Sequence, residues 1–509
     1  MKVGIISINM YSKYLNFACP LHTFAFQQFL LQNGIDSTVI NYQPIYFNGF
    51  DMENPYQYYK QSLKLLRKEK IKNEKKIIDY SKKAKQWKKI VKERFVRYHK
   101  FQEFIDTHYK KTEFCYNSAY LETMPLDFDC YICTTDVIWK VEPHEGFDRG
   151  FFLGSTCMEG KKKISYAASR GVGFVKTGSE KEEFFRYIRD IDFISVREES
   201  LKNYIEENSN RIATVVLDPV LLHTQDFWNS YVKKPKDEHY LFLYYVMEKA
   251  TDTIEEAIQF ALENHLKIIE VTDRPLKYGR VPKNSLVEHQ YIYDIGLEEW
   301  LGYIKYADYI FTNSFHGCCF SLFFEKNFYV GKRNGDKVSH LLDMFSLSER
   351  YFNYDFDILK RNPSINYTKV NQKMEKYRQL SSQFILNAIH SQSDKCQVDY
   401  DEMKQKQSYY LVYTNHYKCK LEEIEDYVLN NGKQKFAPNR FQHGKSRFLY
   451  WHLIVQIDKN LFYYSANREF IDVDKYQGEE LYCAMEEDVI PYFPVHGLRK
   501  VIADAVWEK

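Results

Sequence analysis

The sequence predicts an α/β protein with two consecutive parallel-sheet domains, followed by a smaller α+β module. Three observations support this fold class. Short β-branched runs alternate with helical segments up to about residue 230, the alternation starts again near residue 240, and the pattern changes after residue 400. Strand–helix–strand units form parallel sheets, because parallel neighbours need a crossover connection. A chain of 509 residues is also long enough for more than one core.

The first domain is expected over residues 1–230. KVGIISI at 2–8 is a β-rich run, residues 19–34 follow with helical spacing, and DSTVINY at 36–42 is a second strand. Together they form a βαβ unit. Further strands are expected at 128–136, 161–169, 192–200 and 213–222, with helical segments at 179–188 and 199–208.

A basic helical insertion interrupts this domain at residues 55–111. From Lys60 to Lys111 there are 19 Lys and Arg against 6 Asp and Glu, although the whole chain carries a net charge of only +2. The insertion is either a solvated hairpin packed on the first domain through an apolar stripe, or a surface that docks on an anionic membrane. The apolar residues in question are Leu63, Leu66, Ile77, Ile78, Trp87, Ile90, Val91 and Phe95. The near-neutral total excludes a global nucleic-acid-binding signature.

A second α/β domain is expected over residues 236–395, after the polar linker at 229–240. Its strands and helices alternate through YLFLYYV, TIEEAIQFALENH, LKIIEVT, LEEWLGYIKYA and DYIFTNS. Residues 400–509 form the third module, with a helical segment at 420–432 between two aromatic, strand-like runs. The pattern assigns this module no role.

The protein is expected to be cytoplasmic, with reduced thiols. MKVGIISINM has no long apolar core of a signal peptide, and no stretch approaches the roughly 20 apolar residues of a membrane helix. Cys130 and Cys133 form a C-x-x-C inside a strand-like run, which is either a pair of core residues or a zinc or redox site.

TNSFHGCCFSLFF, residues 312–324, places polar side chains where a strand ends and a hydrophobic helix begins. Active sites of α/β folds lie at the carboxyl ends of strands. His316 is therefore expected to face a cleft and to act in catalysis. Asn313 and Ser314 either contact a substrate there or cap the helix.

Two strand ends of the first domain carry similar residues. Arg197 follows DFISV and either clamps a carboxylate or phosphate, or forms a surface salt bridge with Glu198 or Glu199. Asp136 ends FDCYICTTD and either holds a sugar hydroxyl or caps a helix. Trp139 either stacks on a pyranose ring or belongs to the core.

Two further stretches carry charged residues near predicted strand ends. In LDPVLL, Asp218 and Pro219 are interpreted as a structural turn. GKRNGDKVSHLL gathers Lys332, Arg333 and Lys337, which either complete an anion pocket or lie in a solvated loop.

Taken in order, these motifs resemble those of the polysaccharide pyruvyl transferase family. They are VGIIS, CTTDVIWK (similar to the family's G-S-D-x-x-W), KISYAAS followed by Gly171, FISVREES, VLDPVLL and TNSFHGCCFSLFFEKNF. The resemblance covers roughly residues 1–350. It implies two Rossmann-like domains facing a cleft, similar to the B-type glycosyltransferase fold, with His316 and Arg197 in the active site.

The resemblance also implies a reaction. Phosphoenolpyruvate would donate pyruvate as a cyclic ketal to a sugar diol of a cell-envelope or exopolysaccharide repeat unit, with no cofactor and no metal. His316 would transfer protons, Arg197 would hold the anionic donor and Asp136 would orient the acceptor. Polysaccharide repeat units are commonly built on a polyprenyl diphosphate at the inner face of the membrane, so the resemblance implies an enzyme that works there.

One departure from the family pattern affects the donor. Many members carry Arg-Leu-His where this chain has Ser314, Phe315 and His316. Donor binding is then expected to draw on the cations Lys332, Arg333 and Lys337. Two alternatives stay open: a nucleotide-sugar glycosyltransferase on the same fold, and a non-catalytic scaffold in polysaccharide assembly.

Overall fold

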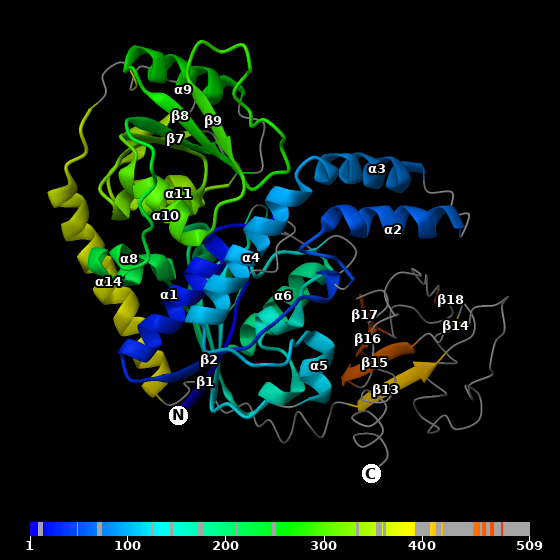
Figure 1. The fold of residues 1–509 in the computed structure, drawn as a ribbon. Coiled ribbons are helices and arrows are strands. Elements are labelled where there is room, and N and C mark those ends of the chain that lie inside the picture. Colours follow the sequence, from blue (N-terminus) through cyan, green and yellow to red (C-terminus); the bar gives the residue numbers. More distant parts are fainter. Residues whose placement is uncertain are drawn as a thin grey trace.

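The computed structural model describes residues 1–391 with short gaps, and six strands between residues 408 and 481. The gaps are 9–13, 48, 69–73, 125, 143–145, 172, 174–177, 210, 247–250, 332–334, 353–358 and 360–362. The fold is α/β, with two parallel sheets and alternating helices as the sequence predicts (Figure 1).

Six parallel strands form the first sheet: β1 (Lys2–Ile6), β2 (Asp36–Val39), β3 (Cys130–Asp136), β4 (Lys162–Ala168), β5 (Phe193–Val196) and β6 (Ala213–Val215). Their order is β2-β1-β3-β4-β5-β6. Side chains of β3 alternate between two hydrophobic cores, one on each face of the sheet. Burial on both faces explains why these strands have continuous apolar runs.

Helices cover both faces of this sheet. Side chains of α1 (Ala18–Gln32) belong to one core, and those of α6 (Ser179–Arg189) and α7 (Glu199–Asn208) to the other. The short helices α5 (Ser118–Thr123) and α8 (Gln225–Asn229) and the 3-10 turn η4 (Pro219–Leu222) complete this half.

The second sheet is also parallel, with the order β12-β11-β10-β7-β8-β9. Its strands are β7 (Tyr240–Tyr244), β8 (Lys267–Val271), β9 (His289–Ile292), β10 (Tyr309–Thr312), β11 (Asn327–Gly331) and β12 (Tyr351–Phe352). Its helices are α9 (Thr251–Glu263), α10 (Leu297–Tyr306), α11 (Phe315–Phe323) and α12 (Lys337–Met344).

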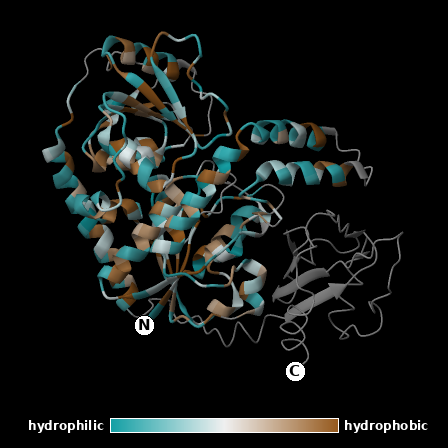
Figure 2. Ribbon diagram, viewed as in Figure 1, coloured by the Kyte–Doolittle hydropathy of each residue, from teal (hydrophilic) through white to brown (hydrophobic). Residues whose placement is uncertain are grey.

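The insertion forms three helices, α2 (Pro55–Lys68), α3 (Glu74–Lys88) and α4 (Val91–His108). In Figure 1, α2 and α3 run side by side and project from the body, whereas α4 lies along it. Figure 2 shows the projecting hairpin as largely hydrophilic. Part of the insertion's apolar stripe is buried, including Leu63 on α2 and Trp87 on α3, while Ile78 on α3 and Phe95 on α4 remain about half exposed at 54% and 50%. Among the described residues, no helix combines the length and the hydrophobicity needed to span a bilayer.

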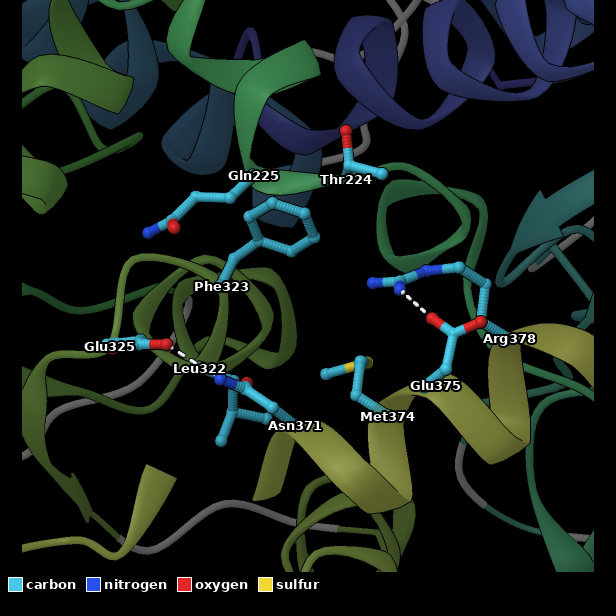
Figure 3. A pocket seen from close by; sticks show the side chains of 9 residues that line it. All are labelled: Thr224, Gln225, Leu322, Phe323, Glu325, Asn371, Met374, Glu375 and Arg378. Atoms are coloured by element: carbon cyan, nitrogen blue, oxygen red, sulfur yellow. Dashed lines mark hydrogen bonds and ion pairs between the residues drawn. The ribbon is translucent and has the colours of Figure 1, made fainter. Parts of the chain in front are cut away.

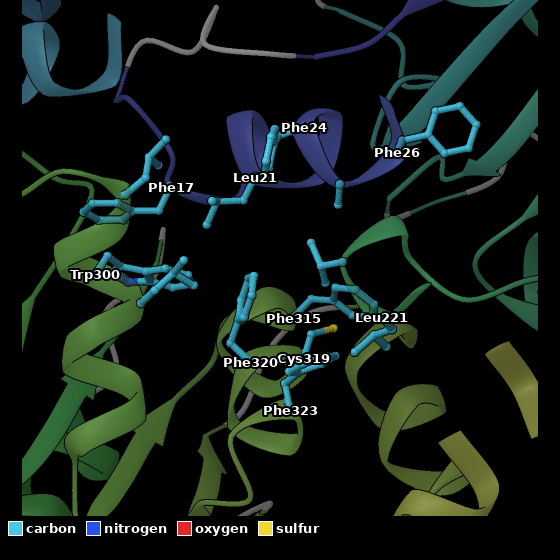
Figure 4. Packing of buried hydrophobic residues seen from close by; sticks show 14 of the residues in the cluster. Phe17, Leu21, Phe24, Phe26, Leu221, Trp300, Phe315, Cys319, Phe320 and Phe323 are labelled. Carbon is cyan, nitrogen blue, oxygen red and sulfur yellow. The ribbon is translucent and has the colours of Figure 1, made fainter. Parts of the chain in front are cut away.

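An apolar interface joins the two halves. Figure 4 shows side chains of α1 facing those of α10 and α11. Phe17 stacks on Trp300 with ring centres 5.3 Å apart and planes 6° from parallel. The long helix α14 (Tyr367–His390) then returns to the first half, where the Leu217 N–H donates to Ser381 Oγ at 2.9 Å.

The third module is described through its strands only. β13 (Ser408–Tyr413), β15 (Trp451–Asp458), β16 (Leu461–Tyr464) and β17 (Glu469–Asp472) form an antiparallel sheet, and β14 (Cys419–Lys420) pairs with β18 (Glu480–Leu481). The helix predicted at 420–432 lies outside the described residues.

Candidate active site

Side chains from four loops meet at the carboxyl ends of the two sheets. Asp136 ends β3, Arg197 follows β5, Asp218 follows β6, and His316 lies in the first turn of α11 after β10. Three of these loops belong to the first sheet and one to the second. The site therefore lies between the two halves of the molecule.

A chain of ion pairs joins these side chains. Lys337 Nζ lies 3.2 Å from Asp136 Oδ1, and Arg197 Nη2 donates to the same oxygen at 2.6 Å. Arg197 Nη1 donates to Asp218 Oδ2 at 2.9 Å, and His316 Nε2 lies 3.1 Å from that oxygen. All five side chains are largely buried, and the most exposed, Asp136, is 18% exposed.

The electrostatics keep both carboxyls ionised. Burial alone would raise the pKa of Asp136 and Asp218, but the surrounding cations outweigh burial and hold both pKa values below the usual range. Lys337 and Arg197 act most strongly on Asp136, and the protonated form of His316, together with Arg197, on Asp218. Burial likewise opposes the charge on Arg197, yet the neighbouring carboxylates raise its pKa above the ordinary value.

The ionised Asp218 fixes the tautomer of neutral His316. A carboxylate only accepts hydrogen bonds, so His316 Nε2 carries the proton and donates it to Asp218. The proton-accepting lone pair is then on Nδ1, which has no hydrogen bond among the described residues. His316 is therefore oriented by one nitrogen and able to exchange a proton through the other.

The turn before α11 holds His316 in this position. Ser314 caps the helix by accepting a hydrogen bond from the Gly317 N–H at 3.2 Å. The Asn313 side chain accepts from Val246 N–H at 2.8 Å and donates to the Val246 carbonyl at 3.1 Å. A Cβ on Gly317 would lie 2.6 Å from Thr312 Oγ1, so the turn requires glycine. Of the two interpretations of Asn313 and Ser314, the structure supports capping and support of the turn.

Arg197 is not a surface residue. Its guanidinium is 2% exposed, it pairs with Asp136 and Asp218, and it lies 4.3 Å from the centre of the Phe315 ring. Glu198 is buried instead against the Ser169 hydroxyl, which donates to it. The alternative of a surface salt bridge to Glu198 or Glu199 does not describe this arginine.

Trp139 belongs to the core. Its indole N–H donates to the Phe151 carbonyl at 3.1 Å, and its ring stacks on Phe152 with centres 5.4 Å apart. The side chain has no exposed surface. The expectation that Trp139 stacks on a sugar ring is therefore replaced by its alternative, a packing role.

The remaining predicted cations and thiols fall in different places. Lys337 joins the ion-pair chain, whereas Lys332 and Arg333 lie outside the described residues. Cys130 and Cys133 are buried in β3, and burial raises the pKa of both thiols, that of Cys130 to about 12.

Sequence reasoning missed two residues of the site. Asp218 was interpreted as part of a turn, and its Oδ1 does accept from the Val220 N–H at 3.2 Å. Its other oxygen binds Arg197 and His316. His22, at the start of α1, lies with its ring centre 5.6 Å from that of His316 and is fully buried. Burial lowers the pKa of His22 to about 3, so this second imidazole is neutral near pH 7.

A pocket elsewhere in the molecule contains none of these residues. It lies where the start of α8, the end of α11 and α14 meet (Figure 3). Its charged groups are paired with neighbours: Glu325 accepts from Asn371 at 2.7 Å, and Arg378 donates to Glu375 at 2.6 Å. It is therefore a weaker candidate than the ion-pair chain.

Comparison with solved structures gives distant likenesses. UDP-N-acetylglucosamine 2-epimerase from Rickettsia bellii is 10% identical, with a TM-score of 0.41 over 79% of this chain and 99% of that one. The UDP-GlcNAc 2-epimerase from Neisseria meningitidis is 9% identical, with a TM-score of 0.39 over 76% and 99%. MurG from Acinetobacter baumannii is 11% identical, with a TM-score of 0.31 over 76% and 99%.

No curated protein matches the sequence. The family model of polysaccharide pyruvyl transferase matches residues 21–330, which is more than half of the chain. The matched region includes Asp136, Arg197, Asp218 and His316. The chain therefore belongs to the polysaccharide pyruvyl transferase family.

Proposed function

We propose that this protein transfers pyruvate from phosphoenolpyruvate to two hydroxyls of a saccharide, forming a cyclic ketal. Family membership supports a transferase of polysaccharide biosynthesis. The observation that carries the reaction type is the Asp218–His316 pair, with the second imidazole nitrogen unpartnered among the described residues. A histidine oriented in this way suits general acid–base catalysis near neutral pH.

The chemistry balances without a cofactor. A proton added to the methylene carbon of phosphoenolpyruvate turns it into a methyl group and makes C2 electrophilic. One sugar hydroxyl attacks C2 and loses its proton. The C2–O bond to phosphate then breaks, and the second hydroxyl attacks C2 and loses its proton to the departing phosphate. The products are the ketal and inorganic phosphate.

We assign the proton transfers to His316 through Nδ1. Asp218 stabilises the imidazolium that forms when Nδ1 accepts a proton. Asp136 uses Oδ1 for Arg197 and Lys337, while its Oδ2 has no hydrogen bond among the described residues. In the proposal, that oxygen orients the acceptor diol.

Phosphoenolpyruvate needs more positive charge than Arg197 and Lys337 alone supply. The positive charges of Arg197 and Lys337 are offset by two carboxylates in the chain of ion pairs. We assign the carboxylate and phosphate of phosphoenolpyruvate to Lys337, Lys332 and Arg333. Arg197 Nε would provide a further hydrogen bond to it. Arg197 Nε is buried without a hydrogen bond among the described residues, so it is free for this contact.

A ligand-binding experiment separates this function from sugar transfer. Phosphoenolpyruvate is expected to raise the melting temperature of the protein, because a ligand that binds only the folded state stabilises it. UDP-glucose and other nucleotide sugars are expected to leave the melting temperature unchanged. Stabilisation by a nucleotide sugar alone would contradict pyruvyl transfer and support glycosyl transfer.

We also propose that the insertion contacts an anionic membrane surface, where a polyprenyl-diphosphate-linked acceptor would be met. The hairpin exposes lysines on both helices: Lys60, Lys64, Lys75, Lys82, Lys85 and Lys88. Leu65 and Ile78 are exposed beside them, at 55% and 54%. Each cation near an anionic bilayer contributes about 1 kcal/mol of attraction, so a few contacts suffice for reversible docking.

A further inference from the structure

Two buried arginines on α4 differ in what they bind. Arg94 and Arg97 lie three residues apart, and neither has any exposed surface. Arg94 donates from both Nε and Nη2 to the Met52 carbonyl, at 2.9 and 2.6 Å. Arg97 donates only from Nη1, to the Thr272 carbonyl at 2.9 Å.

The edge of Arg97 that carries Nε and Nη2 has no partner. Both nitrogens are buried without a hydrogen bond among the residues that the structure describes. This edge of a guanidinium binds carboxylates and phosphates through two parallel hydrogen bonds. In Arg94 a backbone carbonyl fills that edge, whereas in Arg97 it is unfilled.

Aromatic rings fix the orientation of the Arg97 guanidinium. Its central carbon lies 4.0 Å from the ring centre of Phe17 and 4.5 Å from that of Tyr293. Cation–π contacts of this kind hold a guanidinium against the ring faces and leave its edge for hydrogen bonding. Buried, unpaired donors on a charged group are unfavourable. A bound anion would relieve this cost.

A carboxylate with an unfilled oxygen belongs to the same cluster. Asp273 is adjacent to Thr272, whose carbonyl binds Arg97, and it is 3% exposed. Its Oδ1 has no hydrogen bond among the described residues, and Arg274 Nε approaches it only to 3.9 Å. Arg97 acts on Asp273 through its charge, yet their unpaired atoms make no direct contact.

This cluster lies beside the candidate active site. Asp273 follows β8, and β7 alone separates β8 from β10, the strand that leads to His316. Two strand spacings correspond to about 10 Å. Cys19 of α1 is influenced by both Asp136 and Asp273, each of which raises the pKa of its thiol, so the two sites share one neighbour.

We propose that Arg97 and Asp273 bind a phosphorylated sugar, with Arg97 on the phosphate and Asp273 on an adjacent hydroxyl. A phosphate alone would leave Asp273 facing an anion, and a neutral sugar would leave the Arg97 edge without a charged partner. A sugar phosphate satisfies both residues. That this ligand is the acceptor rests on the proposed function, which the inference deepens by naming the acceptor class.

The site is assembled from both halves of the molecule. Arg97 belongs to the insertion in the first domain, and Asp273 follows β8 of the second sheet. A ligand held by both residues would therefore contact both halves. This arrangement gives the insertion helix a part in substrate recognition.

Binding measurements on the full chain test the proposal. Calorimetry with glucose 1-phosphate, glucose, inorganic phosphate and phosphoenolpyruvate compares the wild type with Arg97→Lys, Arg97→Gln and Asp273→Asn. Glucose 1-phosphate is expected to bind the wild type more tightly than glucose or phosphate. Each variant is expected to weaken it by roughly tenfold or more, since each loses a charge-assisted hydrogen bond.

Arg94→Lys is the matched control, because Arg94 lies on the same helix with its edge filled by Met52. It is expected to lower the melting temperature while glucose 1-phosphate binding stays at the wild-type level. Arg97→Lys keeps the positive charge, so glucose 1-phosphate binding is measured on this variant if Arg97→Gln does not fold. Glucose linked to a short prenyl diphosphate distinguishes a lipid-linked acceptor from a free sugar phosphate. Binding that is tighter than that of glucose 1-phosphate and depends on Arg97 indicates a lipid-linked acceptor. Binding equal to that of glucose 1-phosphate indicates a free sugar phosphate.

Three results would overturn the assignment. Unchanged glucose 1-phosphate binding in Arg97→Lys and Asp273→Asn would leave the two residues as a structural pair. Loss of phosphoenolpyruvate binding in Arg97→Lys would assign the edge to the donor. Equal affinity for inorganic phosphate and glucose 1-phosphate would remove the hydroxyl contact. Arg97-dependent sugar phosphate binding by a protein that releases no phosphate from phosphoenolpyruvate would refute only the proposed function.

Discussion

His316 is bound to Asp218 through Nε2, and its Nδ1 is free among the described residues. Replacing His316 with Ala removes the proposed proton-transfer group. We expect kcat to fall by about 10² to 10⁴-fold, the usual contribution of general acid–base catalysis. Steady-state release of phosphate from phosphoenolpyruvate, in the presence of a saccharide acceptor, measures this effect.

Trp139→Phe provides a control at the same scale. It removes the hydrogen bond to the Phe151 carbonyl in the core, so it is expected to lower the melting temperature and leave KM for the acceptor unchanged. Full activity of His316→Ala, or its outright unfolding, would make His316 a structural residue.

Arg197 bridges two buried carboxylates with its two terminal nitrogens. A lysine offers one ammonium and cannot reproduce both contacts. Arg197→Lys is therefore expected to leave one carboxylate unpaired and to lower the free energy of unfolding by about 3–5 kcal/mol, the usual cost of breaking a buried ion pair. Urea denaturation measures the loss. A variant as stable as the wild type would show that the pairing contributes little.

The ion-pair chain predicts acid sensitivity. An unfolded Asp has a pKa of about 3.9, and the folded pKa values of Asp136 and Asp218 lie below it. The two ionised carboxylates therefore stabilise the folded state fully above about pH 4. This stabilisation is lost as pH falls further, toward the folded values. The free energy of unfolding is expected to drop below about pH 4, and the drop should be shallower in Asp218→Asn. Identical pH profiles for the two proteins would contradict this assignment.

For single residues, the sequence predicted which side chains lie in the site better than it predicted which side chains they contact. His316, Arg197 and Asp136 could be identified because each follows a strand of an α/β pattern. Asp218 also follows a strand, but its Asp-Pro pair is typical of a turn. Its partner His316 lies 98 residues away, a contact that no local pattern contains. His22 lies in an apolar helix start and gave no signal at all.

Among the elements, the insertion resolves into two parts. Leu63 and Trp87 pack into the core, which accounts for the apolar stripe, whereas Ile78 and Phe95 stay exposed. The helical pattern predicted the helices. It could not predict which of their apolar residues are buried, because burial depends on what α4 and the first sheet cover. The exposed lysines of α2 and α3 remain available for docking.

The docking proposal predicts salt-dependent sedimentation. The protein is expected to co-sediment with phosphatidylserine liposomes at low salt and to be released at about 0.5 M salt, where the screening length is only a few ångströms. Changing Lys64, Lys82, Lys85 and Lys88 to Gln should abolish sedimentation without altering activity on a soluble acceptor. Exposed lysines elsewhere, at 234, 236, 369 and 376, form the matched control set. Equal sedimentation of both variants and the wild type would refute docking through the hairpin.

For the whole molecule, the sequence predicted two parallel sheets from the two series of strand–helix alternation. It did not predict how the halves meet. Phe17, Trp300 and Phe320 each fit an ordinary helix core, yet together they form the interface between α1, α10 and α11 (Figure 4). That interface brings the carboxyl ends of both sheets together, and His316 of one half reaches Asp218 of the other.

Isotope labelling tests most directly whether this assembly carries out pyruvyl transfer. The protein is incubated in D₂O with phosphoenolpyruvate and a saccharide that has free neighbouring hydroxyls. We expect release of inorganic phosphate and a ketal whose methyl group contains solvent deuterium, detected by NMR and mass spectrometry, both lost in His316→Ala. Transfer of a sugar from a nucleotide sugar, with no consumption of phosphoenolpyruvate in the presence of any saccharide acceptor, would contradict pyruvyl transfer.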